Sequence, residues 1–149
     1  MDFGLLFEMQ VPKPWGPTTE AEAYRNSMVQ AVAAEQAGFT HVWAVEHHFR
    51  EEFSHMGAPE IWLAAVAQQT SRIRIGHGVV LLPTPFNHPV RVAERIGALD
   101  IVSGGRVIAG LGPVAQARTA ELPGHIPLLP DALDACAARP KPLCQHNQM

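Results

Sequence analysis

Residues 73–82 read Ile-Arg-Ile-Gly-His-Gly-Val-Val-Leu-Leu, an almost uninterrupted apolar run that ends at Pro83. A short run of this kind is typical of a strand buried on both faces of a parallel sheet. Similar runs occupy residues 3–7, 41–45 and 106–111. The sequence therefore predicts four buried strands, which begin near residues 3, 42, 73 and 106.

The segments between these runs carry the signals of helix ends. Thr19 and Glu22 have the spacing of a capping box, and Gly38 stands where a glycine commonly follows the last helical turn. Pro59 and Pro89 suit the first turn of two further helices. Strands that alternate with helices predict an α/β fold with parallel strands and right-handed crossovers.

Spacing alone leaves two architectures open, a doubly wound sheet or part of a (β/α)₈ TIM barrel. A full barrel needs roughly 250 residues, whereas this chain has 149 and reaches its fourth predicted strand by residue 112. Residues 113–149 hold six of the thirteen prolines and no convincing fifth strand. We predict about four βα units over 1–112, followed by an irregular, poorly ordered tail over 113–149.

Composition excludes several classes of function. The chain is 47% hydrophobic with a net charge of −3, so it lacks the basic surface of a nucleic-acid-binding protein. No apolar run reaches the ~20 residues that span a bilayer, and Asp2 stands where a signal peptide is basic. We expect a cytoplasmic protein without membrane or nucleic-acid partners. Cys136 and Cys144 are too few for a disulfide scaffold.

Glu46-His47-His48-Phe49 follows the second predicted strand. Active sites of parallel α/β folds lie at the carboxyl ends of the strands, and histidine can donate, accept or relay a proton near neutral pH. Adjacent residues on an extended segment point to opposite sides, so at most one of the two histidines faces the site. The alternative, a structural pair that ties down a loop, stays open. The eight histidines lack metal-ligand spacing, so no metal site is predicted.

Glycines interrupt the third and fourth predicted strands. Gly76 and Gly78 lie inside the third run, where glycine often marks a bulge or a close approach of a ligand, although a packing bend is a serious alternative. Gly110-Leu111-Gly112 ends the fourth run without a complete phosphate-binding pattern, which favours an ordinary strand-end turn.

Several stretches, in this order, together resemble one known family. They are Met1-Asp2-Phe3-Gly4, residues 37–43 (Ala-Gly-Phe-Thr-His-Val-Trp), Glu46-His47-His48-Phe49, residues 74–83, residues 88–94 (His-Pro-Val-Arg-Val-Ala-Glu) and residues 99–106 (Leu-Asp-Ile-Val-Ser-Gly-Gly-Arg). Over about residues 1–112 the chain resembles the N-terminal half of the bacterial luciferase-like flavin-dependent monooxygenases.

The resemblance implies a (β/α)₈ barrel that uses reduced FMN and O₂ on an aldehyde or another small organic substrate. His47 matches the family histidine beside the flavin ring, as a general base or hydrogen-bond partner. Gly78 and Val79 match a non-proline cis peptide pressed against the ring, which makes them cofactor-binding residues. The alternative is a related enzyme that moves hydride with a deazaflavin, which this part of the sequence barely separates from the first.

The resemblance has a departure at Pro113, which stands where the family usually has an arginine that helps to bind the flavin phosphate. The second half-barrel is not recognisable in residues 113–149. We therefore expect a truncated product, as from a shifted reading frame, with little monooxygenase activity alone. A non-catalytic half-barrel that binds flavin or a partner subunit, or that dimerises through its open edges, is the rival interpretation.

Overall fold

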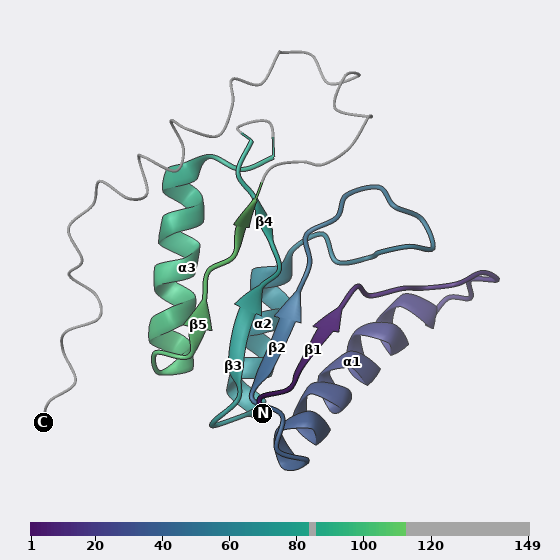
Figure 1. The fold of residues 1–149 in the computed structure, drawn as a ribbon. Coiled ribbons are helices and arrows are strands. Elements are labelled where there is room, and N and C mark those ends of the chain that lie inside the picture. Colours follow the sequence, from purple (N-terminus) through teal and green to yellow (C-terminus); the bar gives the residue numbers. More distant parts are fainter. Residues whose placement is uncertain (84–85, 113–149) are drawn as a thin grey trace, which may run out of the picture.

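The computed structural model describes residues 1–83 and 86–112 (Figure 1). The elements follow in the order β1 (Gly4–Phe7), α1 (Thr19–Gln36), β2 (His41–Ala44), α2 (Pro59–Gln69), β3 (Arg74–His77), β4 (Val80–Leu81), α3 (Pro89–Ser103), β5 (Val107–Ile108) and β6 (Leu111–Gly112). No helix among these is both long and apolar enough to cross a membrane. The tail that we predicted for 113–149 lies outside the described residues.

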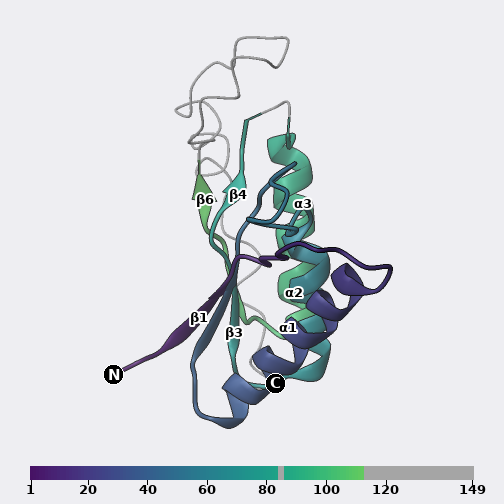
Figure 2. The same ribbon diagram turned by 90° about the vertical axis from the view of Figure 1, so that its right-hand side faces the viewer.

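The main sheet has four parallel strands in the order β1-β2-β3-β5, which is also their order along the chain. All three helices lie on one side of this sheet (Figure 2). A doubly wound sheet reverses its strand order and carries helices on both faces. The observed order and the single helical layer are those of a barrel wall, and the prediction of a partial TIM barrel is confirmed.

The hydrophobic core fills the space between the sheet and the helices. Alternate strand residues such as Phe7, Val42 and Ile75 are buried on that side. The Phe7 ring lies 4.7 Å from the Trp62 ring of α2, between centroids. On the opposite face Leu6 remains 56% exposed. The sheet therefore has one covered face and one open face, and the open face corresponds to the interior of a barrel.

The ends of α1 match the sequence prediction only in part. Gly38 has φ +87, and the N–H of Phe39 after it donates to the Ala34 carbonyl, so the glycine cap is confirmed. The prediction of a capping box at Thr19 and Glu22 is wrong. Thr19 is already the first helical residue, and its hydroxyl oxygen accepts the Gly16 N–H at 2.8 Å. The hydroxyl holds the preceding Pro-rich loop and is not free to cap the helix.

The third predicted strand is two strands in the structure. β3 ends at His77, and β4 begins at Val80 and pairs with β6 in a separate two-stranded parallel sheet. The fourth predicted strand divides in the same way, into β5 and β6. The chain therefore changes direction between β3 and β4, at Gly78 and Val79.

The Glu35 carboxylate fixes the loop that leads into β3. It accepts hydrogen bonds from the backbone N–H groups of Ser71, Arg72 and Ile73, at 3.1, 2.7 and 2.6 Å. Burial alone raises the pKa of Glu35, but these backbone hydrogen bonds outweigh it and leave the pKa below its ordinary value. The ionised form is thus the one that the fold stabilises.

We expect Glu35→Gln to lower the free energy of unfolding by about 1 kcal/mol at neutral pH, because charge-assisted hydrogen bonds are lost. A lowered pKa gives stability that is complete above the unfolded pKa of about 4.3 and is lost as the pH falls through the folded value. The difference from wild type should therefore shrink below about pH 4. Urea denaturation at several pH values measures it, and a pH-independent difference would contradict the assignment.

Candidate functional site

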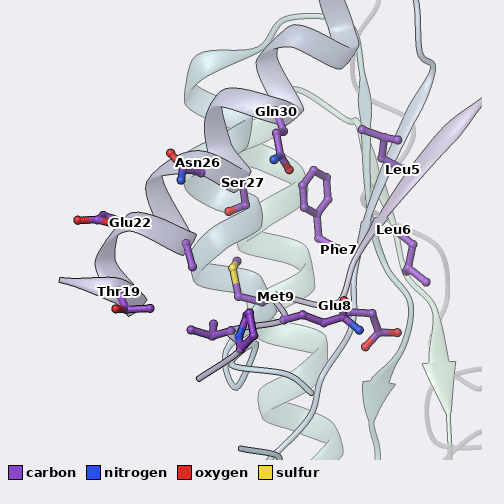
Figure 3. A pocket seen from close by; sticks show the side chains of 14 residues that line it. Leu5, Leu6, Phe7, Glu8, Met9, Thr19, Glu22, Asn26, Ser27 and Gln30 are labelled. Carbon is purple, nitrogen blue, oxygen red and sulfur yellow. The ribbon is translucent and has the colours of Figure 1, made fainter. Parts of the chain in front are cut away.

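The carboxyl ends of β1, β2 and β3 meet at one edge of the sheet, because the three strands are parallel and in register. Glu8 directly follows β1, His47 follows β2, and Gly78 follows β3. Figure 3 shows Leu6 and Glu8 projecting to the side opposite Phe7, away from α1. Glu8 therefore belongs to the open face.

His47 contacts residues of two other segments. Its Nε2 lies 3.3 Å from Glu8 Oε2, and its ring meets Phe53 edge-on at 5.4 Å between centroids. Its backbone N–H donates to the Met56 carbonyl at 3.0 Å. Glu8 Oε2 is buried and makes no aligned hydrogen bond within the part of the chain that the structure describes. A carboxylate oxygen at this distance from an imidazole can help to orient the ring.

Glu8 was missed by the sequence analysis. A single glutamate belongs to no motif, and its one signal is its position directly after the first predicted strand. That position places it at the same edge as any residue that directly follows the second strand.

His48 has different partners from His47. Its Nε2 lies 2.9 Å from Glu46 Oε1, and its ring stacks on Phe86 at 5.1 Å between centroids. The two neighbouring histidines thus point to different surroundings, as the alternation predicted. His48 has the structural role of tying down the loop, and His47 remains the candidate for chemistry.

The Glu46 side chain lies in the protein interior, with only 6% of its surface exposed. Its Oε2 accepts the Leu81 N–H at 2.8 Å, and its Oε1 accepts from Asn87 Nδ2 at 2.8 Å. Asn87 Oδ1 in turn accepts from the Arg95 guanidinium, which also pairs with Glu60. From the sequence, Glu46 was placed only in the motif that follows the second predicted strand, and this network was missed.

Gly78 and Val79 are joined by a cis peptide bond, as the resemblance implied. The Gly78 N–H donates to the Ala44 carbonyl at 2.7 Å, three residues before His47. A Cβ added to Gly78 would lie 3.4 Å from Leu6 Cδ1 and 3.5 Å from Trp43 Cβ. Gly78 therefore adjoins the apolar side chains of the open face.

The other glycines of this region are explained by close packing. A Cβ on Gly76 would lie 2.4 Å from the Trp43 ring, and one on Gly112 would lie 2.6 Å from Val79 Cγ2. The packing interpretation of Gly76 is thus confirmed. Gly112 lets β6 approach the peptide at Val79.

His77 is not part of the open-face site. It is buried on the helix side, where burial lowers the pKa of its ring against the opposing effect of the Glu60 and Glu46 carboxylates. The ring is therefore neutral at pH 7. Among residues 1–83 and 86–112, no three His, Cys, Asp or Glu side chains converge in a way that would hold a metal ion.

A groove of about 590 Å³ lies between β1 and α1, on the helix side of the edge strand (Figure 3). Its lining comes from β1 and the loop after it (residues 5–12) and from α1 (Thr19, Glu22, Ala23, Asn26, Ser27 and Gln30). Glu8 lines one end of it, but His47, Gly78 and Val79 do not. We therefore place the candidate chemistry on the open face and not in this groove.

Comparison of the sequence with known protein families identifies one that matches most of the chain. The family model described as luciferase-like monooxygenase matches residues 1–133. The chain belongs to this family. The luciferase-like match extends beyond residue 112, where we expected the resemblance to stop at Pro113, so the family pattern continues past the missing arginine.

Three luciferase-like relatives illustrate the range of the family. The chain is 42% identical to limonene 1,2-monooxygenase of Rhodococcus erythropolis over 94 residues, which are 63% of this chain and 24% of the relative. It is 37% identical to an F420-dependent glucose-6-phosphate dehydrogenase of Amycolatopsis mediterranei over 90 residues, 59% of this chain and 27% of the relative.

The third is a solved structure, the oxygenating constituent of 3,6-diketocamphane monooxygenase from Pseudomonas putida in complex with FMN. It superimposes with a TM-score of 0.71 at 26% identity, over 81% of this chain and 32% of that one. The chain thus spans about a quarter to a third of these proteins. Luciferase-like proteins use FMN or F420, and both kinds are among its relatives.

Proposed function

We propose that this chain forms the flavin-facing edge of an oxidoreductase that uses reduced FMN and O₂ to oxygenate an aldehyde or another small organic substrate. The observation that carries the proposal is the pairing of His47 with Glu8 at the strand edge that also bears Gly78 and Val79. Relatives that are monooxygenases support the same chemistry.

The residues of the open face fit a flat flavin ring. Leu6, Trp43 and Val79 offer partly exposed apolar surface, and Gly78 has no side chain to block a ring that approaches the backbone. When bound, the reduced flavin supplies the electrons that activate O₂. Cofactor-binding roles for Gly78 and Val79 follow from this fit and from the family resemblance.

His47 is the candidate for proton transfer. His47 Nε2 lies 3.3 Å from Glu8 Oε2, and a neutral imidazole keeps a lone pair on one of its two ring nitrogens that can act as a base. Phe53 packs against the edge of the ring and restricts its orientation. His47 can then take a proton at that nitrogen, with Glu8 and Phe53 beside its ring.

Hydride transfer with a deazaflavin is the second candidate, because the F420-dependent relative is 37% identical to the chain. The same strand edge would bind the deazaflavin, since the His47 ring can equally accept the proton that leaves a substrate hydroxyl. Flavin binding without turnover is the third candidate. β1 and β5 each pair on one side only within the described sheet, so we expect this chain alone to turn over little substrate.

We expect the chain to bind reduced or oxidised FMN saturably at micromolar concentration, as followed by anaerobic flavin fluorescence. His47→Ala should leave the affinity within about threefold and lower any turnover by about 10²–10⁴-fold, because general base catalysis is lost. His88→Asn is the matched control. His88 is an exposed histidine that accepts the Val90 N–H at the start of α3, and asparagine can do the same.

The outcomes separate the candidates. Saturable binding of F420 without FMN would favour hydride transfer, and FMN binding without detectable turnover would favour the flavin-binding half-barrel. Absence of binding of both at high micromolar concentration would contradict a cofactor site in this chain.

A further inference from the structure

We propose that Glu46 is a positioning residue of this site, whose carboxylate holds β4 and Asn87 against the end of β2. It would thereby fix His47 relative to Gly78 and Val79. The proposal rests on the proposed function, because it assigns Glu46 to the flavin-facing edge.

Backbone pairing between β2 and the third strand stops just before the site. The last paired residues are Ala44 and His77, and the Gly78 N–H still donates to the Ala44 carbonyl. Beyond this point β4 pairs only with β6 in the described residues. Glu46 supplies the next connection, because its Oε2 accepts the Leu81 N–H at 2.8 Å. The Glu46 side chain thus connects the end of β2 to β4, where backbone hydrogen bonds between the two segments are absent from the described residues.

The same carboxylate reaches a second loop. Its Oε1 accepts from Asn87 Nδ2 at 2.8 Å, and Asn87 Nδ2 also donates to the Leu81 carbonyl at 2.8 Å. The Leu81 N–H is therefore bonded to Glu46, and the Leu81 carbonyl is bonded to Asn87. Leu81 lies two residues after Val79. Its two backbone hydrogen bonds therefore fix the position of the peptide between Gly78 and Val79.

A buried carboxylate costs free energy unless hydrogen bonds compensate it, and apolar packing often stabilises a core equally well. Glu46 is compensated by three hydrogen bonds, from Leu81, Asn87 and His48. It does not lie among the open-face side chains, so it acts on a bound flavin through its neighbours. A buried carboxylate whose hydrogen bonds are all satisfied favours one conformation of the surrounding backbone. We infer that these bonds fix the position of the adjacent His47 in addition to stabilising the fold.

Glu46→Gln tests the proposal, because an amide offers one acceptor and turns a donor NH₂ toward Leu81 N–H or Asn87 Nδ2. We expect exchange of the Leu81 amide proton to become at least tenfold faster. We expect the Kd for FMN to rise about tenfold, and the circular dichroism of bound FMN at saturation to change. Glu94→Gln is the matched control, since Glu94 is exposed on α3 and pairs with Arg91, and it should behave as wild type in all three measurements.

Asn87→Ala is the second variant, because it removes the donor to the Leu81 carbonyl and to Glu46 Oε1 while it leaves the Glu46 carboxylate in place. It should also raise the Kd for FMN and speed exchange of the Leu81 amide proton, and it keeps the test decisive if Glu46→Gln does not fold. Wild-type FMN affinity and spectrum in folded Glu46→Gln, or wild-type FMN affinity in Asn87→Ala, would overturn the proposal. If wild type binds neither FMN nor F420, the proposed function fails instead, and the Leu81 exchange rate still decides whether Glu46 holds β4.

Discussion

Gly110→Ala is expected to lower the free energy of unfolding by about 3 kcal/mol, the upper part of the range for overpacking. A Cβ at this position would lie 2.0 Å from the His77 carbonyl oxygen and 3.2 Å from its carbon. Both are backbone atoms, so no side-chain rotation relieves the overlap. The Gly110 carbonyl also accepts the Val80 N–H at 2.8 Å. Moving the chain away at Gly110 would therefore loosen β4 and the adjoining Gly78 and Val79.

Gly57→Ala is the matched control for this substitution. The nearest atom to a Cβ there is the His47 carbonyl oxygen at 3.8 Å, an ordinary van der Waals contact. Urea denaturation of both variants gives the comparison, and FMN affinity reports on the site. Equal unfolding free energies for the two variants would show that β5 and β6 do not approach β3 as closely as the structure places them.

The helices and the parallel strand order of this fold are predictable from sequence because they depend on local signals. Pro59 and Pro89 begin helices where they were expected, and Gly38 follows the end of α1. The break between β3 and β4 is not predictable in this way. Val79 and Val80 continue the same apolar run, and the partner that redirects them, β6, lies some thirty residues later in the chain.

The candidate site also has residues that local signals identify and residues that they do not. His47 was identified because a histidine after a strand is a local signal and because the flanking residues resemble a family. Glu8 and the hydrogen-bonding role of Glu46 were missed because their significance depends on contacts with distant residues, His47 in one case and Leu81 in the other. The incorrect capping box at Thr19 has a similar cause, since Gly16 competes for the hydroxyl.

Trp62→Ala is expected to lower the free energy of unfolding by about 4 kcal/mol, as large-to-small aromatic substitutions in cores do. Trp62 is only 2% exposed and connects three elements. Its ring packs on Phe7 of β1, and its Nε1 donates to the Ser27 hydroxyl of α1 at 2.9 Å. Truncation therefore opens a cavity and also leaves the Ser27 hydroxyl without this partner.

Trp62→Phe is the milder variant. It keeps an aromatic ring against Phe7 but removes the indole N–H and part of the ring volume, so we expect a loss of about 1–2 kcal/mol. Urea denaturation followed by circular dichroism measures both variants. Because β1 is an edge strand joined to the sheet by β2 alone in the described residues, the Trp62 contact is a main anchor of the β1–α1 unit that carries Glu8. A loss below about 1 kcal/mol in Trp62→Ala would show that this unit is not packed on α2 as the structure describes.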